Sequence, residues 1–188
     1  MDLSTYEMKS VFSGERIYLK LLTEEDITDN VMSWFNDPVL MQYYTDSKSE
    51  ITKAKLLESI KKGQENKNNY TYGIYYTEND ELIGTVKLGP INHVHKISDL
   101  ATLIGNANYH HRGLAVEAIK VGNQIAFEQF GIRKLFSGMY ESNISSIKAY
   151  THANWVIEGR LKGQFLVNGK TEDKILVACF NPKYFEDA

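Results

Sequence analysis

The chain has 188 residues, of which 43% are hydrophobic and 24% charged, and its formal net charge is −3. These values are typical of one globular domain and leave no basic footprint for nucleic acid or an anionic membrane, so neither is expected as a partner. No run of about 18 apolar residues occurs, which argues against a membrane span, and the first residues lack a signal-peptide core. A single cysteine, Cys179, excludes an internal disulfide. We expect a cytoplasmic protein in which this thiol is buried and inert.

The first part of the chain predicts an arm, a strand and two helices. Residues 1–14 are polar and unpatterned, which predicts a flexible arm before one domain at 15–188. Residues 16–22 alternate between apolar and polar side chains and predict a strand. The acids that follow Thr23 predict the start of a helix there, and a second helix is expected from about residue 50 to 62.

The middle of the chain predicts an antiparallel hairpin followed by a break. Residues 70–77 and 82–88 are rich in β-branched and aromatic side chains and predict its two strands. Residues 89–96 break the pattern. His93 and His95 within them alternate like a pair of metal ligands, but no third ligand has suitable spacing. Solvated loop histidines are the alternative, and no metal is expected.

The last part of the chain predicts a strand, a long helix, a strand, a short helix and a final hairpin. The strands are expected at 97–104 and 134–140, the long helix from Leu114 to Gly131, and the short helix at about 145–153. Two further strands, at 156–165 and 171–180, are joined by an Asn-Gly turn, which is a strong hairpin signal.

These elements predict an α+β fold. We expect a mixed, mostly antiparallel sheet of about seven strands flanked by four helices. The strand–helix–strand unit at 97–140 contributes the one parallel pair through a right-handed crossover.

The segment His110-His111-Arg112-Gly113-Leu114-Ala115 lies between an apolar strand and a helix. The first N–H groups of a helix lack internal partners and carry partial positive charge, so this turn predicts an anion site. No dinucleotide or P-loop motif is present, and Gly113 could also serve helix packing alone. The small residues Gly113 and Ala115 leave space for a ligand to approach the backbone, and Arg112 and the two histidines add donors. This combination suits a pyrophosphate.

The order of elements and these motifs resemble the GNAT acyl-CoA-dependent N-acetyltransferases. Within that superfamily the chain is most similar to the branch of ribosomal-protein N-terminal, spermidine and amino-sugar acetyltransferases. The resemblance covers about residues 13–185 and includes Glu15-Arg16-Ile17-Tyr18-Leu19-Lys20, the anion loop with Val116-Glu117-Ala118, Asn143-Ile144-Ser145-Ser146 with Tyr150, and Glu158-Gly159. Two positions depart from the pattern. His110 replaces a usual Gln or Arg, and Gly138 stands where some members carry a base.

The resemblance implies a single GNAT-like domain whose fourth and fifth strands, at 97–104 and 134–140, splay apart to admit acetyl-CoA as cosubstrate. No metal is implied. The residues expected at the cofactor are Leu103, Ile104, His110, His111, Arg112, Gly113, Leu114, Ala115, Val116, Asn143 and Ser146.

The same resemblance implies N-acetyl transfer to a primary amine by direct attack in a ternary complex. Tyr150 is the candidate acid for the leaving thiolate, with packing alone as the alternative. Asp99 is the first choice for the base, and a structural ion pair is equally open for it. Glu117 and Glu141 are weaker candidates, and Glu117 is better suited to bracing the helix start.

The acceptor site is expected between the N-terminal helices and the last hairpin. Its candidate residues are Trp34, Tyr43, Tyr44, His93 and Tyr140. Rings and histidines favour an amino sugar such as a sugar nucleotide. A peptide N-terminus and a polyamine are alternatives, although a polyamine needs more carboxylates than Asp37, Asp46 and Glu50 provide. A non-catalytic acyl-CoA sensor is the alternative from another class. The expected assembly is a monomer or a homodimer.

Overall fold

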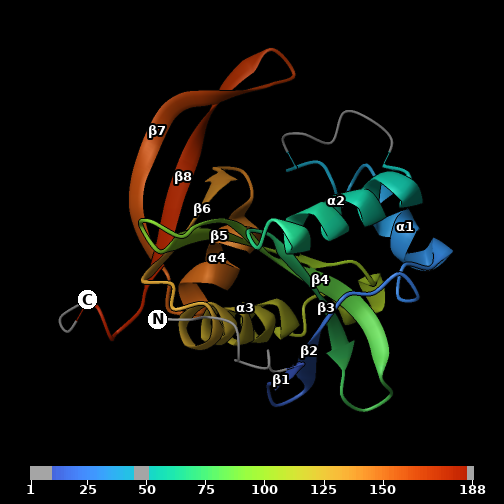
Figure 1. Ribbon diagram of the computed structural model, residues 1–188. Helices are drawn as coiled ribbons and strands as arrows, with labels where there is room; N and C mark the ends of the chain where they lie inside the picture. The colour runs from blue at the N-terminus through green and yellow to red at the C-terminus, as the bar shows by residue number, and fades with distance from the viewer. Residues whose placement is uncertain (1–9, 45–50, 186–188) are drawn as a thin grey trace.

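The structure is a computed structural model that describes residues 10–44 and 51–185. Eight strands form one sheet in the order β1-β2-β3-β4-β5-β6-β8-β7 (Figure 1). Their bounds are Val11–Ser13 for β1, Ile17–Leu21 for β2, Tyr70–Tyr76 for β3, Glu81–Asn92 for β4, Ile97–Ile104 for β5, Lys134–Tyr140 for β6, Val156–Val167 for β7 and Lys170–Phe180 for β8. Only β5 and β6 pair in parallel, as the sequence predicts.

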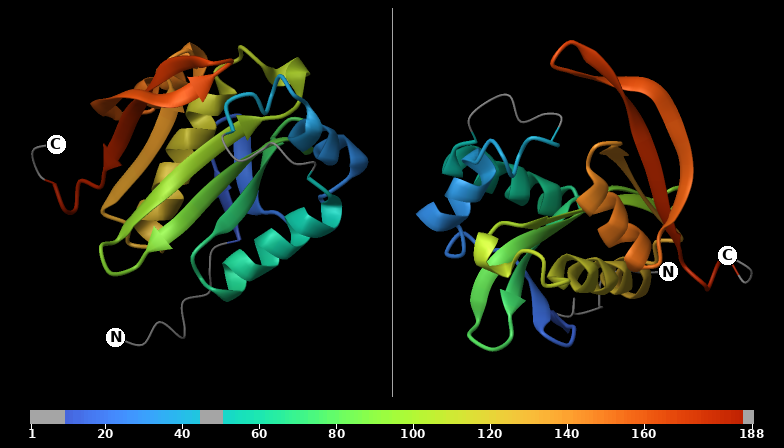
Figure 2. Two further views of the ribbon diagram at one scale, coloured as in Figure 1. Left: turned by 90° about the horizontal axis from the view of Figure 1, so that it is seen from above. Right: turned by 180° about the vertical axis from the view of Figure 1, so that it is seen from behind.

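The described residues form four α-helices, and helices cover both faces of the sheet (Figure 2). They are α1 (Asp29–Asn36), α2 (Lys53–Glu65), α3 (Leu114–Gln124) and α4 (Ile144–His152). The first two lie on one face. On the other, α3 packs beside α4 and continues into a π-helical turn, Ile125–Gln129. A short 3-10 turn, Ala107–Tyr109, precedes α3.

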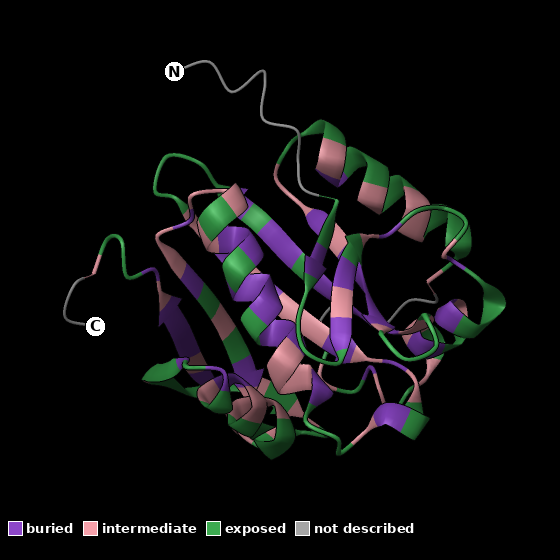
Figure 3. Ribbon diagram, turned by 90° about the horizontal axis from the view of Figure 1, so that it is seen from below, coloured by how far each residue is buried: buried purple, intermediate pink, exposed green. Residues whose placement is uncertain are grey.

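The main core lies between the sheet and α3. Leu114, Ala118 and Ile125 recur at helical spacing and are buried against the inner strands. Figure 3 shows the buried residues on the inner strands and on the face of the helix that meets them. Gly122 allows the close approach, because a Cβ there would lie 2.8 Å from Leu100 Cδ1. This packing fixes where the first turn of α3 sits relative to β5.

The two parallel strands separate after a short paired stretch. Pairing between β5 and β6 involves only residues 97–99 and 134–136. Beyond that, β5 continues to Ile104 on the β4 side and β6 to Tyr140 on the β8 side. The predicted splay between the fourth and fifth strands of the sequence scheme is therefore confirmed. Beyond residues 99 and 136, the facing edges of the two strands do not pair with each other.

Three local predictions were wrong. Residues 11–13, expected in the arm, form β1 by pairing with β2, whereas 1–9 lie outside the described residues. The first helix begins after Thr28, because Asp26 accepts hydrogen bonds from Thr23 and closes a turn. The third strand of the sequence scheme, β4, does not end at Leu88. It passes through a register shift and re-pairs with β5.

Three turn predictions are confirmed by backbone angles. The hairpin of β7 and β8 turns at Asn168 and Gly169, with φ of 50° and 79°. Asn154 after α4 has φ of 67°, and Gly131 after the π-helical turn has φ of 61°. These positions need the left-handed region, which asparagine and glycine adopt at the lowest cost.

Candidate active site

The anion loop forms a cradle of backbone N–H groups at the start of α3. His111 and Gly113 both adopt left-handed conformations, with φ of 59° and 76°. Gly113 is the N-cap of α3 and makes no side-chain cap bond. The N–H groups of the first helical turn are therefore open to a ligand. Alternating left-handed residues ahead of a helix start produce an anion-binding concavity.

Side chains of this loop hold the loop itself. His110 Nε2 lies 2.8 Å from the carbonyl oxygen of Ile104, at the end of β5. The Arg112 guanidinium lies over the Tyr109 ring, 5.1 Å from its centroid. Tyr109 in turn donates a 2.7 Å hydrogen bond to Glu81 of β4. The histidine that departs from the family pattern thus ties the loop to β5.

One cleft collects every residue predicted at the cofactor. Its lining comprises the predicted set Leu103, Ile104, His110, His111, Arg112, Gly113, Leu114, Ala115, Val116, Asn143 and Ser146, together with Leu40, Tyr43, Tyr44, Thr102, Tyr109, Ile119, Ser145, Ala149, Tyr150 and His152. Asn143 caps α4 by accepting a 3.2 Å hydrogen bond from the Ser146 N–H. The sequence did not point to Thr102, which sits at the splay in an apolar strand.

A second pocket adjoins this cleft in the gap between β5 and β6. It is lined by Tyr43, Tyr44, Asp99, Ala101, Thr102, Ser137, Gly138, Met139, Tyr140, Asn143, Ser146 and Tyr150. The two cavities share Thr102, Asn143 and Tyr150, among others. A ligand arm that runs through the cleft therefore ends beside the pocket that contains Asp99.

Asp99 provides a carboxylate within the second pocket. Its Oδ1 is buried and has no hydrogen-bond partner among the described residues. Burial raises the pKa of Asp99, while the Ser137 hydroxyl, the Leu100 amide and the charges of Lys87 and Lys174 act in the opposite direction. A desolvated carboxylate with an unused lone pair is suited to accept a proton from a bound amine.

Tyr150 is buried at the junction of the two cavities. Its hydroxyl donates a 2.7 Å hydrogen bond to the Leu100 carbonyl oxygen, and its ring packs edge-on to Trp155. Burial, reinforced by the charge of Asp99, raises the pKa of Tyr150 well above the usual tyrosine range. The phenol therefore stays protonated and can donate a hydrogen bond.

An aromatic wall borders the pocket on the acceptor side. Tyr140 stacks on Phe165 of β7 with centroids 3.9 Å apart, and Tyr43 lies 5.6 Å from Tyr140 at a tilt. Lys174 Nζ sits over the Phe165 ring, 5.8 Å from its centroid. The wall therefore already accommodates one ammonium group.

Two predicted acceptor residues lie elsewhere. Trp34 is 4% exposed and packs against Gly105, so it belongs to a small core cluster and lines neither cavity. The helix that carries it, α1, starts after Thr28, later than expected. His93 bonds through Nε2 to the Lys67 carbonyl oxygen at 2.8 Å, in the β4–β5 turn at the paired end of β5. Tyr43, Tyr44 and Tyr140 do line the second pocket.

Most carboxylates near the acceptor side already have partners. Arg160 pairs with both Glu141 and Asp173. Glu172 accepts a 2.7 Å hydrogen bond from the Ser142 N–H. Asp37 caps a turn by accepting from the Val39 N–H at 2.7 Å, and Asp46 and Glu50 lie outside the described residues. Asp99 is thus the carboxylate of this region that keeps an unpartnered buried oxygen within the described chain.

Gly138 faces the end of the Lys174 side chain. A Cβ at this position would lie 2.0 Å from Cε of Lys174 on the neighbouring strand. The aliphatic part of Lys174 therefore fills the space in which some members of the resembled family carry a catalytic base. No signal local to residue 138 in the sequence identifies that partner, since the two residues meet only through strand pairing.

Residues 10–44 and 51–185 contain neither a candidate membrane span nor a candidate metal site. None of the helices there is long and apolar enough to cross a membrane. No group of three or more potential metal-ligating side chains was found in that same part of the chain.

Comparison with known proteins gives independent evidence on the family. Residues 16–155 match the Acetyltransferase (GNAT) domain family. The chain belongs to this family. The match confirms the resemblance drawn from the anion loop and the order of elements.

Individual relatives are more distant. The spermidine N(1)-acetyltransferase of Escherichia coli K12 is 29% identical over 107 residues. The matched region covers 57% of this chain and 57% of that relative. A probable N-acetyltransferase of Bacillus subtilis 168, YjcK, is 23% identical over 92% of this chain and 98% of its own length. The structure of a Vibrio cholerae spermidine N-acetyltransferase in complex with CoA and spermine superposes with a TM-score of 0.80 at 21% identity, covering 90% of this chain and 98% of that one. Spermidine acetyltransferases are one group of the predicted branch.

Proposed function

We propose that this protein is an acetyl-CoA-dependent N-acetyltransferase that acetylates a primary amine by direct attack in a ternary complex. The observation that carries the proposal is the junction of the two cavities. A cleft with a backbone anion cradle meets a pocket with a buried carboxylate, and Tyr150 lies where they join. Membership in the GNAT family supports the same chemistry.

Acetyl-CoA fits the cleft by its own chemistry. The pyrophosphate takes the open N–H groups at Gly113 and the first turn of α3. The pantetheine arm runs along the unpaired part of β5, where backbone groups near Leu103 can bind its amides. The thioester then lies at the splay, and no metal is required for this arrangement.

The chemical step uses Asp99 and Tyr150. The amine lone pair attacks the thioester carbonyl carbon, a C–N bond forms, and the C–S bond breaks as the thiolate leaves. Asp99 accepts the proton lost by the nitrogen, directly or through water. Tyr150 turns from the Leu100 carbonyl oxygen and donates a hydrogen bond to the leaving sulfur. Because the pKa of Tyr150 is raised, complete proton transfer would leave a costly buried phenolate. We therefore assign Tyr150 a hydrogen-bonding role toward the sulfur.

We propose a polyamine-like acceptor, an aliphatic chain that bears a primary amine. The relatives in E. coli and V. cholerae are named for spermidine, and the aromatic wall suits a second ammonium group. The amino sugar predicted from the rings and histidines has no support among these relatives, and His93 lies away from the pocket. A peptide N-terminus remains the alternative acceptor.

The test is an assay with a panel of amines. Purified protein is incubated with acetyl-CoA and, separately, spermidine, spermine, a monoamine, a sugar-nucleotide amine and a short peptide. Free thiol and acetylated products are measured, the latter by mass spectrometry. We expect thiol release and acetylation with a polyamine. Coenzyme binding without thiol release on any amine would refute the enzyme and favour an acyl-CoA sensor.

Assembly and location stay predictions. A Vibrio cholerae spermidine N-acetyltransferase is described as dodecameric, whereas the sequence of this chain led us to expect a monomer or homodimer. Light scattering of the purified protein decides between them. We retain the expectation of a cytoplasmic protein.

A further inference from the structure

Glu117 places a carboxylate in the first turn of α3, the helix that starts at the anion loop. Its side chain is 14% exposed. An uncompensated negative charge here would repel a polyanion bound at the same helix start. A purely electrostatic reading thus predicts that Glu117 weakens cofactor binding.

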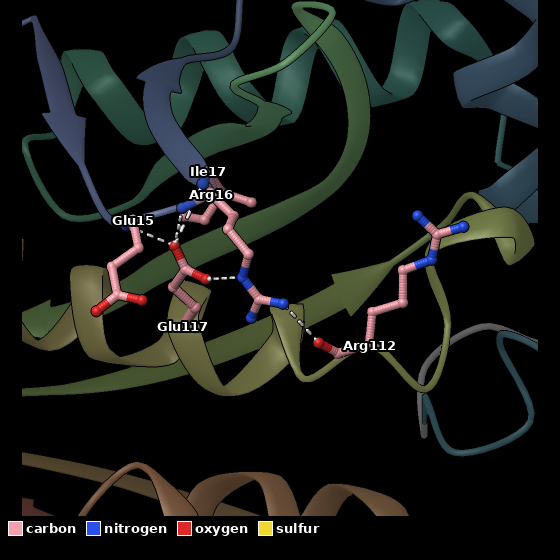
Figure 4. A network of polar contacts seen from close by, with 5 residues as sticks. All are labelled: Glu15, Arg16, Ile17, Arg112 and Glu117. Carbon is pink, nitrogen blue, oxygen red and sulfur yellow. Dashed lines mark hydrogen bonds and ion pairs between the residues drawn. The ribbon is translucent and has the colours of Figure 1, made fainter.

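The carboxylate is almost fully engaged with the start of β2 (Figure 4). Glu117 Oε1 accepts hydrogen bonds from the N–H groups of Glu15, Arg16 and Ile17 at 2.7, 2.6 and 3.2 Å. Its Oε2 accepts from Arg16 Nε at 3.1 Å. A Cβ at residue 14 would lie 2.6 Å from Oε1, so Gly14 permits this approach. Its negative charge is therefore balanced by four donors and held away from the loop.

Arg16 connects this carboxylate to the anion loop. While Nε bonds Glu117, Nη1 donates a 3.0 Å hydrogen bond to the Arg112 carbonyl oxygen. Figure 4 shows the Arg112 side chain leaving in the other direction, so the contact is with its backbone alone. In a planar trans peptide the N–H points opposite to the C=O. Because the Arg112 oxygen is held toward Arg16, the Gly113 N–H points away from Arg16. Arg16 is not among the residues that line the cleft.

We propose that Arg16 and Glu117 are positioning residues that fix the peptide between Arg112 and Gly113 in its anion-binding orientation. The proposal rests on the proposed acetyl-CoA site, because the ligand of the loop is its pyrophosphate. Glu117 acts through Arg16, and Arg16 acts through the peptide; neither needs to touch the cofactor. His111 and Gly113, the neighbours of Arg112 in the chain, both have left-handed backbone conformations, and the bond from Arg16 holds the peptide between them.

The variants separate anchoring from charge. Arg16→Lys keeps the positive charge but cannot bond Glu117 and the Arg112 oxygen in the same fork. Glu117→Gln removes a negative charge near the phosphates. Lys120→Met removes a positive charge from an exposed residue of the same helix and is the matched control.

CoA affinity is measured by calorimetry for each variant, with Tm recorded alongside. Anchoring predicts that Arg16→Lys and Glu117→Gln each bind CoA about tenfold more weakly, in line with the loss of a charge-assisted hydrogen bond, while Lys120→Met stays within about twofold. At saturating acetyl-CoA, kcat is preserved. Tighter binding by Glu117→Gln, or unchanged binding by Arg16→Lys, overturns the proposal.

A second readout does not depend on the cofactor. Hydrogen exchange of the peptide covering residues 110–116 is followed in the free protein. It accelerates in Arg16→Lys if the anchor holds the loop, and remains at the wild-type rate if it does not. If wild-type protein fails to bind CoA, the proposed function fails, and this exchange rate still decides whether Arg16 anchors the loop.

Discussion

The cleft at the anion loop, proposed for the cofactor, and the pocket with Asp99, proposed for the acceptor, adjoin one another but are built on different principles. The cleft presents main-chain N–H groups of one continuous segment, His110 to Val116, whose side chains mostly brace the loop. The pocket presents side chains from four distant segments, and its carboxylate has an oxygen with no partner among the described residues. The cleft thus offers open main-chain N–H groups, whereas the pocket holds a desolvated carboxyl group.

This difference separates binding from chemistry. A backbone site tolerates many side-chain changes but is sensitive to backbone conformation. A side-chain site depends on particular functional groups and incurs a stability cost for burying them. Substitutions at the pocket should therefore change turnover, and those at the loop should change cofactor affinity. Four variants test that division.

Asp99→Asn should have the largest effect. Loss of the base lowers kcat about 100-fold, at the low end of the range for acid–base catalysis, while CoA affinity stays unchanged. Steady-state kinetics and calorimetry measure the two. Asp26→Asn, a carboxylate bonded to Tyr75 outside the pocket, is the control and should retain activity. Equal losses of turnover in both variants would contradict a catalytic role.

The raised pKa of Asp99 adds a dependence of stability on pH. Between its ordinary pKa and the raised one, the folded state binds more protons than the unfolded state, so stability falls as pH rises through this window. Above the raised pKa, the charged Asp99 carboxylate continues to destabilise the folded state. Thermal unfolding should show a higher Tm for Asp99→Asn than for wild type at neutral pH, and no such gain below the window.

Tyr150→Phe should lower kcat about tenfold, because the hydrogen bond to the leaving sulfur is lost while the ring still packs on Trp155. The assay is turnover at saturating substrates. Tyr72→Phe removes another buried hydroxyl, one without a partner among the described residues, and should leave kcat unchanged. A wild-type rate in Tyr150→Phe would reduce this tyrosine to packing alone.

Gly113→Ala tests the backbone site. Its φ of 76° is unfavourable for alanine, although the nearest atom to the added Cβ would be 3.8 Å away. Relaxation of the loop should weaken CoA binding about sevenfold and cost about 1 kcal/mol of stability. Gly131→Ala has a similar φ of 61° and open space outside the cleft, so it should lose the same stability and keep its affinity. Calorimetry and thermal unfolding compare the pair.

Tyr140→Leu should raise the KM for the amine about fivefold, through loss of the ring that stacks on Phe165, with little change in CoA affinity. Kinetics with varied polyamine measure it. Tyr184→Leu, an exposed ring near the C-terminus, is the control. An equal rise in the KM for acetyl-CoA would show that the wall serves both cavities and would contradict the separation of cofactor binding from the acceptor pocket.

The two sites also differ in how far sequence predicts them. The anion loop is local, because its basic residues, glycine and helix start are adjacent in the chain. The positions outside it, Leu103, Ile104, Asn143 and Ser146, came from the family resemblance, and all eleven predicted cofactor positions line one cleft. The roles of those positions stay predictions. The splay follows from the order of elements and is confirmed by the short pairing of β5 with β6.

The acceptor side depends on contacts that sequence does not encode locally. Trp34 packs against Gly105 in a small core cluster, and no signal near residue 34 identifies that neighbour. His93 was expected at the acceptor site with the loop at 89–96, but it lies in the turn between β4 and β5 and bonds to Lys67. The clash that keeps Gly138 small involves Lys174, 36 positions along the chain, and only the register of β6 with β8 brings them together.

The most direct test of the central claim follows the acetyl group itself. Wild-type protein is mixed with acetyl-CoA labelled in its acetyl carbon and with excess polyamine, and the protein and amine are both weighed by mass spectrometry while free thiol is titrated. The account predicts one labelled acetyl on the amine for each thiol released, no release without amine, and no acetyl on the protein. An acetylated protein that forms without amine, or thiol released without acetylated amine, would contradict direct attack in a ternary complex.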